Sequence, residues 1–367
     1  MKRKRIYFFI GTPAEYIKIA PVIRELKNRK INFKTITSGQ SKILFDELKD
    51  YTGEVKVDIA FNVETHKLSI PHFLVWTIRT FLICLYSLRK ELSGLDKNNN
   101  YLIVHGDTVS SLMGAIIAKI YRVQLVHIES GLRSFSFFEP FPEEINRFII
   151  SHLADIRFCQ NESALNNVKN LKGININTKQ NTLIESFWWA IKRKTKMNSF
   201  EKFKRYYVLY IRRQDHIFFK KEWLVKTLEF IVTNANKNLN CIFVLHPLAS
   251  VFLSPEKNAN LYHLLGKRLF LVSILPYADL MKLMYNSEFA VTDGCTNQEE
   301  VYYMGLPFLA LRNRTERTEG LGQNVVISKG KKNVIKSFFK NYKKYKRKPV
   351  AIRERPSKII VDYLTTH

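Results

Sequence analysis

The sequence predicts an α/β protein made of two doubly wound, Rossmann-like domains that face one another across a cleft. Short apolar runs recur in both halves of the 367-residue chain, and segments with a helical spacing of apolar residues lie between them. Glycine and charged residues follow several of these runs directly, and open α/β sheets bind ligands at the carboxyl ends of their strands. At this length, each of two domains can bury a core of its own.

The charge of the chain favours an anionic partner. Lysine and arginine number 59 against 32 aspartates and glutamates, so the formal net charge is +27. A nucleotide, a polyanion or an anionic membrane surface fits this excess, and so does a solvated lysine-rich surface. Because no helix-turn-helix or RNP-type pattern accompanies the charge, we expect no specific nucleic-acid binding. The four cysteines are scattered without a CxxC pair, which indicates a reducing, cytoplasmic location and no structural zinc.

The first strand is predicted over Arg5 to Gly11, and a helix follows it at once. Thr12 suits the N-cap, Pro13 the first helical position, and Glu15 the third residue after the cap. We interpret Glu15 as a capping-box carboxylate rather than a catalytic one. Lys18 lies one turn into this helix, near an N-terminus that favours anions, and is a candidate phosphate ligand.

Further elements complete the first half of the chain. The apolar spacing predicts a strand over 32–39, helices over 41–48 and 73–92, a strand before Asp107, a helix over 110–121, a strand from Val123, a helix over 146–153 and a strand over 155–159. The helix over 73–92 is apolar on nearly every side but carries Arg79, so it is too interrupted to span a bilayer. We expect its outer face to contact a second copy in a homodimer or, peripherally, the anionic inner membrane.

Two neighbouring strand ends carry acidic residues that indicate catalysis. Asp107 follows one apolar strand and Glu129 follows the next. Glu143 lies further along the same connection, which also holds Arg133. Charged groups placed directly after buried strands reduce stability unless they are paired or open to a cleft. We therefore predict that Asp107, Glu129 and Glu143 are acid/base residues of an active site.

The second half repeats this format. Strands are predicted over 207–211, 241–247, 269–275, 289–293 and 307–311, with helices over 223–235 and 277–285 between them. Because the chain is expected to change domain near 174–180, we place the first domain at residues 1–176 and a nucleotide-binding domain at 177–349. A last helix within 350–367 is expected to return to the first domain.

A turn of small residues in the second half is typical of diphosphate binding. The apolar strand ends at Asp293, and the turn Gly294-Cys295-Thr296 leads into a helix that carries Glu300. Small residues let backbone N–H groups approach a diphosphate, and Glu300 can accept both ribose hydroxyls. An ordinary helix start with exposed acids explains the same residues. The chain has no P-loop, HExxH, GxSxG or DxD motif and no GxGxxG after its first strand, so we expect neither a cofactor nor a metal ion.

Several motifs together resemble the UDP-N-acetylglucosamine 2-epimerase family along most of the chain. In order, they are GTPAEYIKIAP, HGDT, HIESGLRS, PFPEEINR, DGCTNQEE and RTERTEG. The resemblance implies the GT-B arrangement of two Rossmann-like domains. It also implies inversion at C2 of UDP-GlcNAc to give UDP-ManNAc, a precursor of surface polysaccharides. The family route eliminates UDP and adds it back, in non-hydrolysing or hydrolysing form.

The resemblance also implies roles for individual residues. The implied catalytic residues are Asp107, Glu129, Glu143 and, in place of a family histidine, His216. The implied contacts with UDP and the sugar are Lys18, Arg133, Arg212, His246, Asp293, Gly294, Cys295, Thr296, Glu300 and Arg317.

This chain departs from the family pattern where the diphosphate is held. Pro13 replaces an arginine, residues 211–214 lack the histidine of the HRRE stretch, and Cys295-Thr296 replaces a glycine pair. These losses, the basic surface and the apolar helix favour a second interpretation, a membrane-associated GT-B glycosyltransferase with a lipid-linked or glycan acceptor. The intact carboxylates favour the epimerase, which we prefer.

Overall fold

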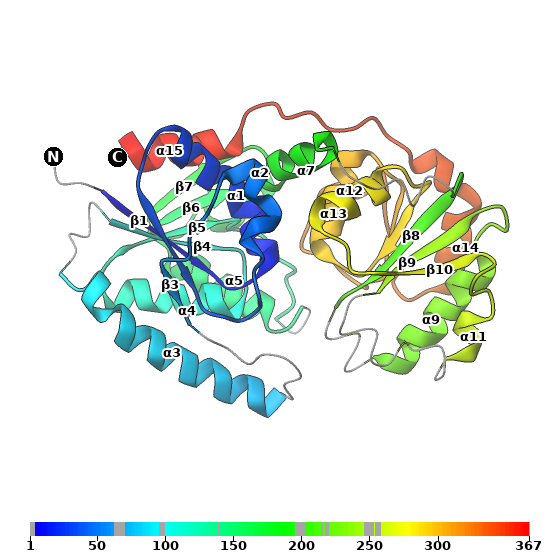
Figure 1. Ribbon diagram of the computed structural model, residues 1–367, viewed down its shortest axis with the longest axis horizontal. Helices are drawn as coiled ribbons and strands as arrows, with labels where there is room; N and C mark the ends of the chain where they lie inside the picture. The colour runs from blue at the N-terminus through cyan, green and yellow to red at the C-terminus, as the bar shows by residue number, and fades with distance from the viewer. Residues whose placement is uncertain are drawn as a thin grey trace. The chain divides into compact units, whose positions relative to one another are not determined.

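The chain forms two compact units, each built on its own parallel sheet (Figure 1). The computed structural model describes residues 4–61, 70–94, 100–137, 140–194, 203–213, 216, 220–245, 253 and 258–366. The first unit comprises Met1–Ser186 together with Ile352–His367, and the second comprises Phe187–Ala351.

The first unit contains a seven-stranded sheet in the order β3-β2-β1-β4-β5-β6-β7. Its strands are β1 (Arg5–Ile10), β2 (Phe33–Thr37), β3 (Ile59–Ala60), β4 (Asn100–His105), β5 (Gln124–Ile128), β6 (Ile156–Cys159) and β7 (Ile174–Asn177). Its helices are α1 (Pro13–Asn28), α2 (Lys49–Thr52), α3 (Ile70–Leu92), α4 (Val109–Ile120), α5 (Glu143–Leu153), α6 (Glu162–Val168) and α15 (Pro356–Thr366). Figure 1 shows α1 and α15 on one face of this sheet and α3 and α4 on the other. The strand order reverses between β1 and β4, which is where open α/β sheets bind ligands.

The second unit contains a six-stranded sheet in the order β10-β9-β8-β11-β12-β13. Its strands are β8 (Tyr206–Ile211), β9 (Asn240–Leu245), β10 (Leu269–Ser273), β11 (Ala290–Thr292), β12 (Phe308–Ala310) and β13 (Val325–Ile327). Its helices are α9 (Lys221–Asn234), α11 (Ala259–Tyr262), α12 (Tyr277–Tyr285), α13 (Cys295–Met304) and α14 (Lys332–Asn341), and α7 (Leu183–Lys192) enters from the first unit. The order reverses between β8 and β11, so their carboxyl ends form a second switch point.

The central strands are apolar because helices cover both of their faces. All six residues of β4 and all six of β8 are buried. All the strand pairs are parallel. Continuous apolar runs are what doubly covered parallel sheets require. The predicted α/β class with two doubly wound sheets is therefore confirmed.

The start of α1 has the predicted capping box. The hydroxyl of Thr12 accepts a hydrogen bond from the backbone N–H of Glu15 at 3.3 Å, and the Glu15 carboxylate accepts one from the Thr12 N–H at 2.7 Å. Pro13 occupies the first helical position. The same carboxylate also accepts from the N–H of Gly11 at 2.7 Å and from the Ser111 hydroxyl at 2.6 Å. Glu15 therefore joins α1 to the start of α4, as a structural carboxylate.

Some predicted elements are wrong in position or kind. The helix expected over 41–48 is only a 3-10 turn, Phe45–Leu48, followed by the short α2, because Leu44 is exposed and this stretch has no continuous buried stripe. The segment near 174–180, expected to cross between domains, contains β7, which pairs with β6. Helix α5 begins at Glu143 rather than Asn146.

A buried carboxylate, that of Glu185 in α7, joins the end of residues 1–186 to the returning segment, residues 352–367. Glu185 accepts hydrogen bonds from the Ser357 N–H at 2.8 Å and from the Arg355 guanidinium at 3.1 Å. Arg355 also donates to Glu25 of α1 at 2.8 Å. Helix α15 packs on α1, and residues 352–367 thereby complete the first unit.

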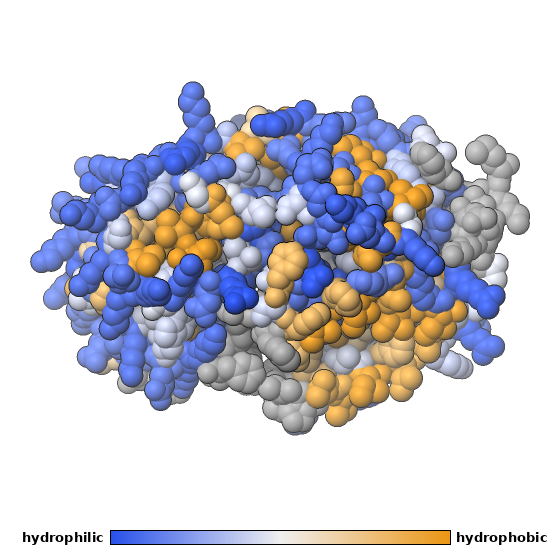
Figure 2. All heavy atoms as spheres, turned by 180° about the vertical axis from the view of Figure 1, so that it is seen from behind, coloured by the Kyte–Doolittle hydropathy of each residue, from blue (hydrophilic) through white to orange (hydrophobic). Residues whose placement is uncertain are grey.

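Helix α3 has one buried side and one exposed apolar side. Cys84, Leu88 and Leu92 lie in the core of the first unit. The outer side carries exposed Leu74, Val75, Ile78, Leu82, Ile83 and Tyr86. Figure 2 shows apolar side chains gathered over this part of the surface. No helix in the described part of the chain has both the length and the apolar character needed to cross a membrane.

Candidate functional site

Acidic side chains gather at the carboxyl ends of β4 and β5 in the first unit. Asp107 follows β4, Glu129 follows β5, and Glu143 is the first residue of α5. Strands β4 and β5 are paired, so the first two positions lie on neighbouring strand ends. The start of a helix also favours a carboxylate, because the unpaired N–H groups there carry a partial positive charge.

Glu129 forms a buried ion pair with Lys18. The ammonium group lies 2.8 Å from Oε1 and 2.6 Å from Oε2 of the carboxylate, and each side chain is about nineteen-twentieths buried. The amide of Asn181 donates to Oε2 as well, and also to Gln160 at 2.7 Å. Glu129 has a φ of 64°, in the left-handed region that L-residues rarely adopt. Such strain persists only where the surroundings fix it, so this carboxylate is held in one orientation.

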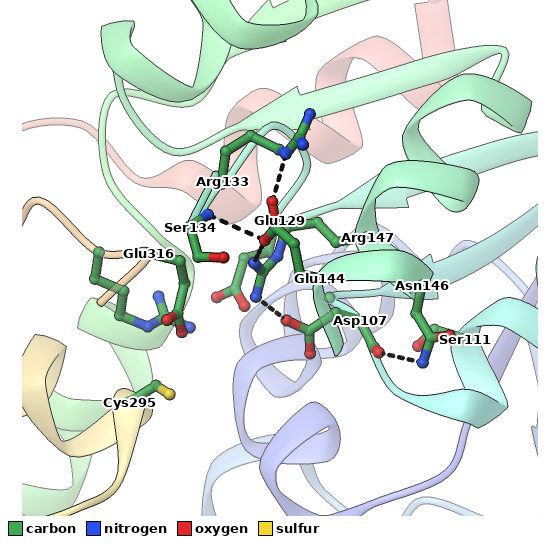
Figure 3. Close-up of polar contacts among 12 residues, drawn as sticks. Asp107, Ser111, Glu129, Arg133, Ser134, Glu144, Asn146, Arg147, Cys295 and Glu316 are labelled. Carbon is green, nitrogen blue, oxygen red and sulfur yellow. Dashed lines mark hydrogen bonds and ion pairs between the residues drawn. The ribbon is translucent and has the colours of Figure 1, made fainter. Parts of the chain in front are cut away.

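A second network surrounds Glu144, which is fully buried (Figure 3). Its carboxylate accepts from Nε of Arg133 at 2.6 Å and from the N–H of Ser134 at 3.0 Å. Arg147 bridges Glu144 and Asp107 with its two terminal nitrogens. The amide of Asn146 fixes the same loop by donating to the backbone carbonyl of Asp107 at 3.0 Å. Asp107 is therefore oriented by α5.

Glu144 and Asn181 were not among the residues predicted for the site. Glu144 sits beside Glu143 and three residues before Arg147, and this spacing brings opposite charges together on a helix. That signal was available in the PFPEEINR stretch. Glu143 itself is half-buried at the first turn of α5, whereas Glu144 points into the arginine pair. Asn181 carried no comparable signal, because it reaches Glu129 from a segment 52 residues away.

His127 on β5 lies next to these networks and stays neutral. Its Nε2 lies 2.8 Å from the carbonyl oxygen of Gly106, so Nε2 carries the hydrogen and donates it. Burial lowers the pKa of His127 from 6.5 to about 4, while the hydrogen bond to Gly106 opposes that change. A neutral imidazole here avoids adding another buried charge beside Arg157 and Arg147.

In the second unit, the predicted diphosphate turn forms the N-terminus of α13. Gly294 is the N-cap, and a Cβ atom there would lie 2.5 Å from Oδ1 of Asn297 and 2.9 Å from Nε of Arg212. A side chain at position 294 would therefore require Asn297 and Arg212 to move. Arg212 donates to the Thr296 hydroxyl at 3.3 Å, and Arg312 donates to the Cys295 sulfur at 2.7 Å. Two guanidinium groups thus flank the start of this helix.

Asp293, at the end of β11, organises the loop that follows β8. It is fully buried and accepts from the N–H groups of Arg212 at 2.9 Å and Arg213 at 3.1 Å. Nδ1 of His216 lies 3.2 Å from the same carboxylate, and its ring packs edge-on against Trp223. Burial lowers the pKa of Arg212, but Tyr210 and nearby acids raise it above its ordinary value overall. Arg212 is therefore a permanent cation beside the turn.

The remaining predicted residues are placed as follows. Glu300 is buried on α13 and accepts from the Asn297 amide at 2.8 Å. Arg317 forms a buried ion pair with Glu299. His246 lies outside the described residues. Among the residues that are described, no three His, Cys, Asp or Glu side chains are grouped as a metal site.

The structure brings the predicted residues together in two clusters, one in each unit. Lys18, Arg133 and the carboxylates belong to the first, and Arg212, His216 and the turn at Gly294 belong to the second. The first offers fixed carboxylates suited to proton transfer. The second offers a helix N-terminus, a glycine and cations, which suit an anion.

Known proteins resemble this chain over nearly its whole length. The family model described as UDP-N-acetylglucosamine 2-epimerase matches residues 79–358. The UDP-N-acetylglucosamine 2-epimerase of Campylobacter jejuni is 28% identical over 357 residues, covering 91% of this chain and 88% of the relative. That of Methanocaldococcus jannaschii is 27% identical over 354 residues, covering 91% of each.

Solved structures agree on the fold. The M. jannaschii UDP-GlcNAc 2-epimerase in complex with UDP-GlcNAc and UDP superposes with a TM-score of 0.82 at 23% identity, covering 99% of this chain and all of that one. The Staphylococcus aureus MnaA–UDP structure gives 0.82 at 22% identity, covering 98% and 96%. Because the family model spans more than half of the residues, the chain belongs to the UDP-N-acetylglucosamine 2-epimerase family.

Proposed function

We propose that this protein inverts C2 of UDP-GlcNAc to give UDP-ManNAc. The observation that supports this most directly is the set of carboxylates at the ends of β4 and β5 and at the start of α5, within a chain of this family. Glu129 is buried, oriented by Lys18 and Asn181, and strained in φ, as residues at active sites often are.

In the proposed reaction, UDP leaves C1 and then returns. A carboxylate takes the C2 proton while the C1–O bond breaks, its electron pair departs with UDP, and a C1–C2 double bond forms in a 2-acetamidoglucal. UDP then adds back to C1, and a second carboxylate returns a proton to C2 from the opposite face. We assign the two proton transfers to members of the set Asp107, Glu129 and Glu143, because two acid/base groups are needed on opposite faces of the ring.

The leaving diphosphate needs positive charge because the C2 proton is only weakly acidic. We assign this role to Arg212, His216 and the turn at residues 294–296, with Lys18, Arg133 and His246 as further contacts. Asp293 acts indirectly by positioning Arg212 and His216. Glu300 is assigned to the ribose hydroxyls. Arg317 is a positioning residue, since its guanidinium is paired with buried Glu299.

Incubation with UDP-GlcNAc in deuterated water tests the proposal. We expect deuterium at C2 of recovered UDP-GlcNAc and UDP-ManNAc. A hydrolysing enzyme would instead release free ManNAc together with UDP. Recovery of unlabelled UDP-GlcNAc alone would contradict the epimerase and favour the glycosyltransferase, which leaves C2 untouched.

We also propose a location and a partner. All four cysteines are free thiols, which suits the cytoplasm. The exposed apolar side of α3 is a candidate surface for a second copy, because patches of this kind mark interaction sites. Arg79, Arg89 and Lys90 are also exposed on α3 and would suit anionic lipid headgroups, so peripheral membrane contact is the alternative occupant.

A further inference from the structure

We propose that a cavity in the second unit is a binding site for phosphate groups. It has a volume of about 320 Å³ and opens among the loops that follow β8, β12 and β13. The residues that matter for the argument are His216, Lys220, Trp223, Arg312, Asn313 and Lys329. A cavity of this size holds a diphosphate with room for solvent.

The lining of the cavity carries positive charge and no negative charge. Lys220, Arg312 and Lys329 are cations, His216 is the one other titratable group, and no aspartate or glutamate is among the lining residues. Lys220 and Lys329 are exposed and form no ion pair with any residue that the structure describes. Lysine offers only hydrogen-bond donors, and so does arginine. A lining that offers hydrogen-bond donors and no carboxylate suits an anion.

Two members of the lining are fixed before any ligand arrives. Arg312 is almost fully buried, and its guanidinium is held by the Cys295 sulfur at 2.7 Å and the Glu316 carboxylate at 3.1 Å. His216 is equally buried and is held by Asp293. Since Glu316 balances Arg312, the uncompensated positive charge of the lining comes from Lys220 and Lys329.

The backbone places Lys329 in a costly conformation. Its φ is 50°, in the left-handed region, and its N–H donates to the carbonyl of Arg312 at 2.9 Å. The neighbouring Gly330 also has a positive φ of 66°, so glycine is already used beside it. The hydrogen bond to the Arg312 carbonyl fixes the backbone of Lys329 beside Arg312.

The cavity adjoins the proposed diphosphate turn through its two fixed residues. Arg312 contacts Cys295, and His216 contacts Asp293. Cys295 and Asp293 are the two chain neighbours of Gly294. The phosphate therefore has two candidate sources. One is the diphosphate of the nucleotide sugar, and this arm rests on the proposed function. The other is a separate phosphate ion.

Calorimetric titration of the full chain with inorganic phosphate, UDP and uridine at low salt tests this. The variant is Lys220→Gln with Lys329→Gln, and the control is Lys237→Gln with Lys267→Gln, which removes the same charge from exposed positions elsewhere in the second unit. We expect the variant to bind phosphate about tenfold more weakly than wild type, and the control to bind within about twofold.

The UDP titrations separate the sources. If the cavity takes the substrate diphosphate, the variant also loses UDP affinity while uridine affinity stays the same, and phosphate competes with UDP. If it takes a separate ion, UDP affinity is unchanged and phosphate binds alongside UDP. Unchanged affinities for both phosphate and UDP in the variant would overturn the proposal. Because these readouts need no turnover, failure of the exchange experiment in deuterated water would leave them standing.

Discussion

Glu129 and Lys18 form a pair in which each buried charge depends on the other. Removing one partner of such a pair leaves an uncompensated charge, which is destabilising whatever the role of the residue. A loss of activity alone therefore does not identify a catalytic carboxylate. A matched control is needed, and the first unit contains one in Glu185, which is equally buried and is paired with Arg355.

Glu129→Gln is expected to cut turnover by about a thousand-fold or more while UDP affinity stays similar, because the amide cannot accept the C2 proton. Steady-state kinetics and UDP titration measure both quantities. Glu185→Gln should lower the Tm about as much as Glu129→Gln does, but its turnover should stay within a few-fold of wild type. Near-normal turnover in Glu129→Gln would remove this residue from the mechanism.

His127 predicts a specific loss of stability in acid. The pKa of His127 is about 4 in the folded chain, against 6.5 for an unperturbed histidine. As the pH falls below 6.5, the unfolded chain therefore binds a proton that the folded chain does not bind. Stability is therefore lost between about pH 6.5 and pH 4, by at most roughly 3 kcal/mol. His127→Gln should flatten the fall of Tm over that range, whereas His152→Gln, at an exposed histidine, should not. Parallel curves for wild type and His127→Gln would contradict the assignment.

The candidate site could be predicted from sequence where residues follow strands. Asp107, Glu129 and Asp293 each come directly after an apolar run, and that position predicts that they lie at the carboxyl edge of a sheet. The partners of these groups could not be predicted in the same way. Lys18 was expected to bind phosphate, and the structure brings it to Glu129, 111 residues away. Such pairing depends on tertiary packing, which no local pattern encodes.

The connection from β5 to α5 is an element whose shape depends on glycine. Gly131 has a φ of 83°, and a Cβ atom there would lie 2.1 Å from the backbone oxygen of Ala164. Gly94 has a similar φ of 73° but nothing within 4 Å of the same position. Replacing each glycine therefore distinguishes two costs of adding a side chain. At Gly94 only the positive φ is unfavourable, whereas at Gly131 the side chain also collides with the backbone.

Gly94→Ala is expected to cost about 1 kcal/mol, from the positive φ alone. Gly131→Ala should cost several times more, because a carbonyl of α6 must move as well. Urea unfolding of both variants measures the difference. Equal losses would show that the connection adapts and that the collision is relieved without cost.

Regular elements were predictable where one period dominated the pattern. Most strands of both sheets and α1, with its capping box, follow from apolar runs and N-cap chemistry. Strand β13 was missed because only one of its three residues is buried, and β7 because its alternating isoleucines and asparagines suit an edge strand rather than a buried one. The turn at Phe45 has several apolar residues but no continuous buried side, so its pattern imitated a helix.

For the whole molecule, the exposed side of α3 predicts self-association. Val75→Glu with Ile78→Glu places two charges on this surface, since both residues are more than half exposed. We expect wild type to elute at twice the 43.1 kDa chain mass in size exclusion with light scattering, and the variant at one chain mass. Leu44→Glu, at an exposed residue outside α3, is the control. A monomeric wild type that sediments with anionic vesicles, and is released by salt, would instead favour the membrane.

The return of residues 352–367 to the first unit ties its completion to the order of synthesis. The ribosome delivers these residues only after all of the second unit. Until then α1 lacks the cover of α15, and Glu25 and Glu185 lack the guanidinium of Arg355. The half of the molecule that emerges first is therefore finished last. During translation it therefore remains a partly open intermediate, with the surface of α1 that α15 later covers still exposed.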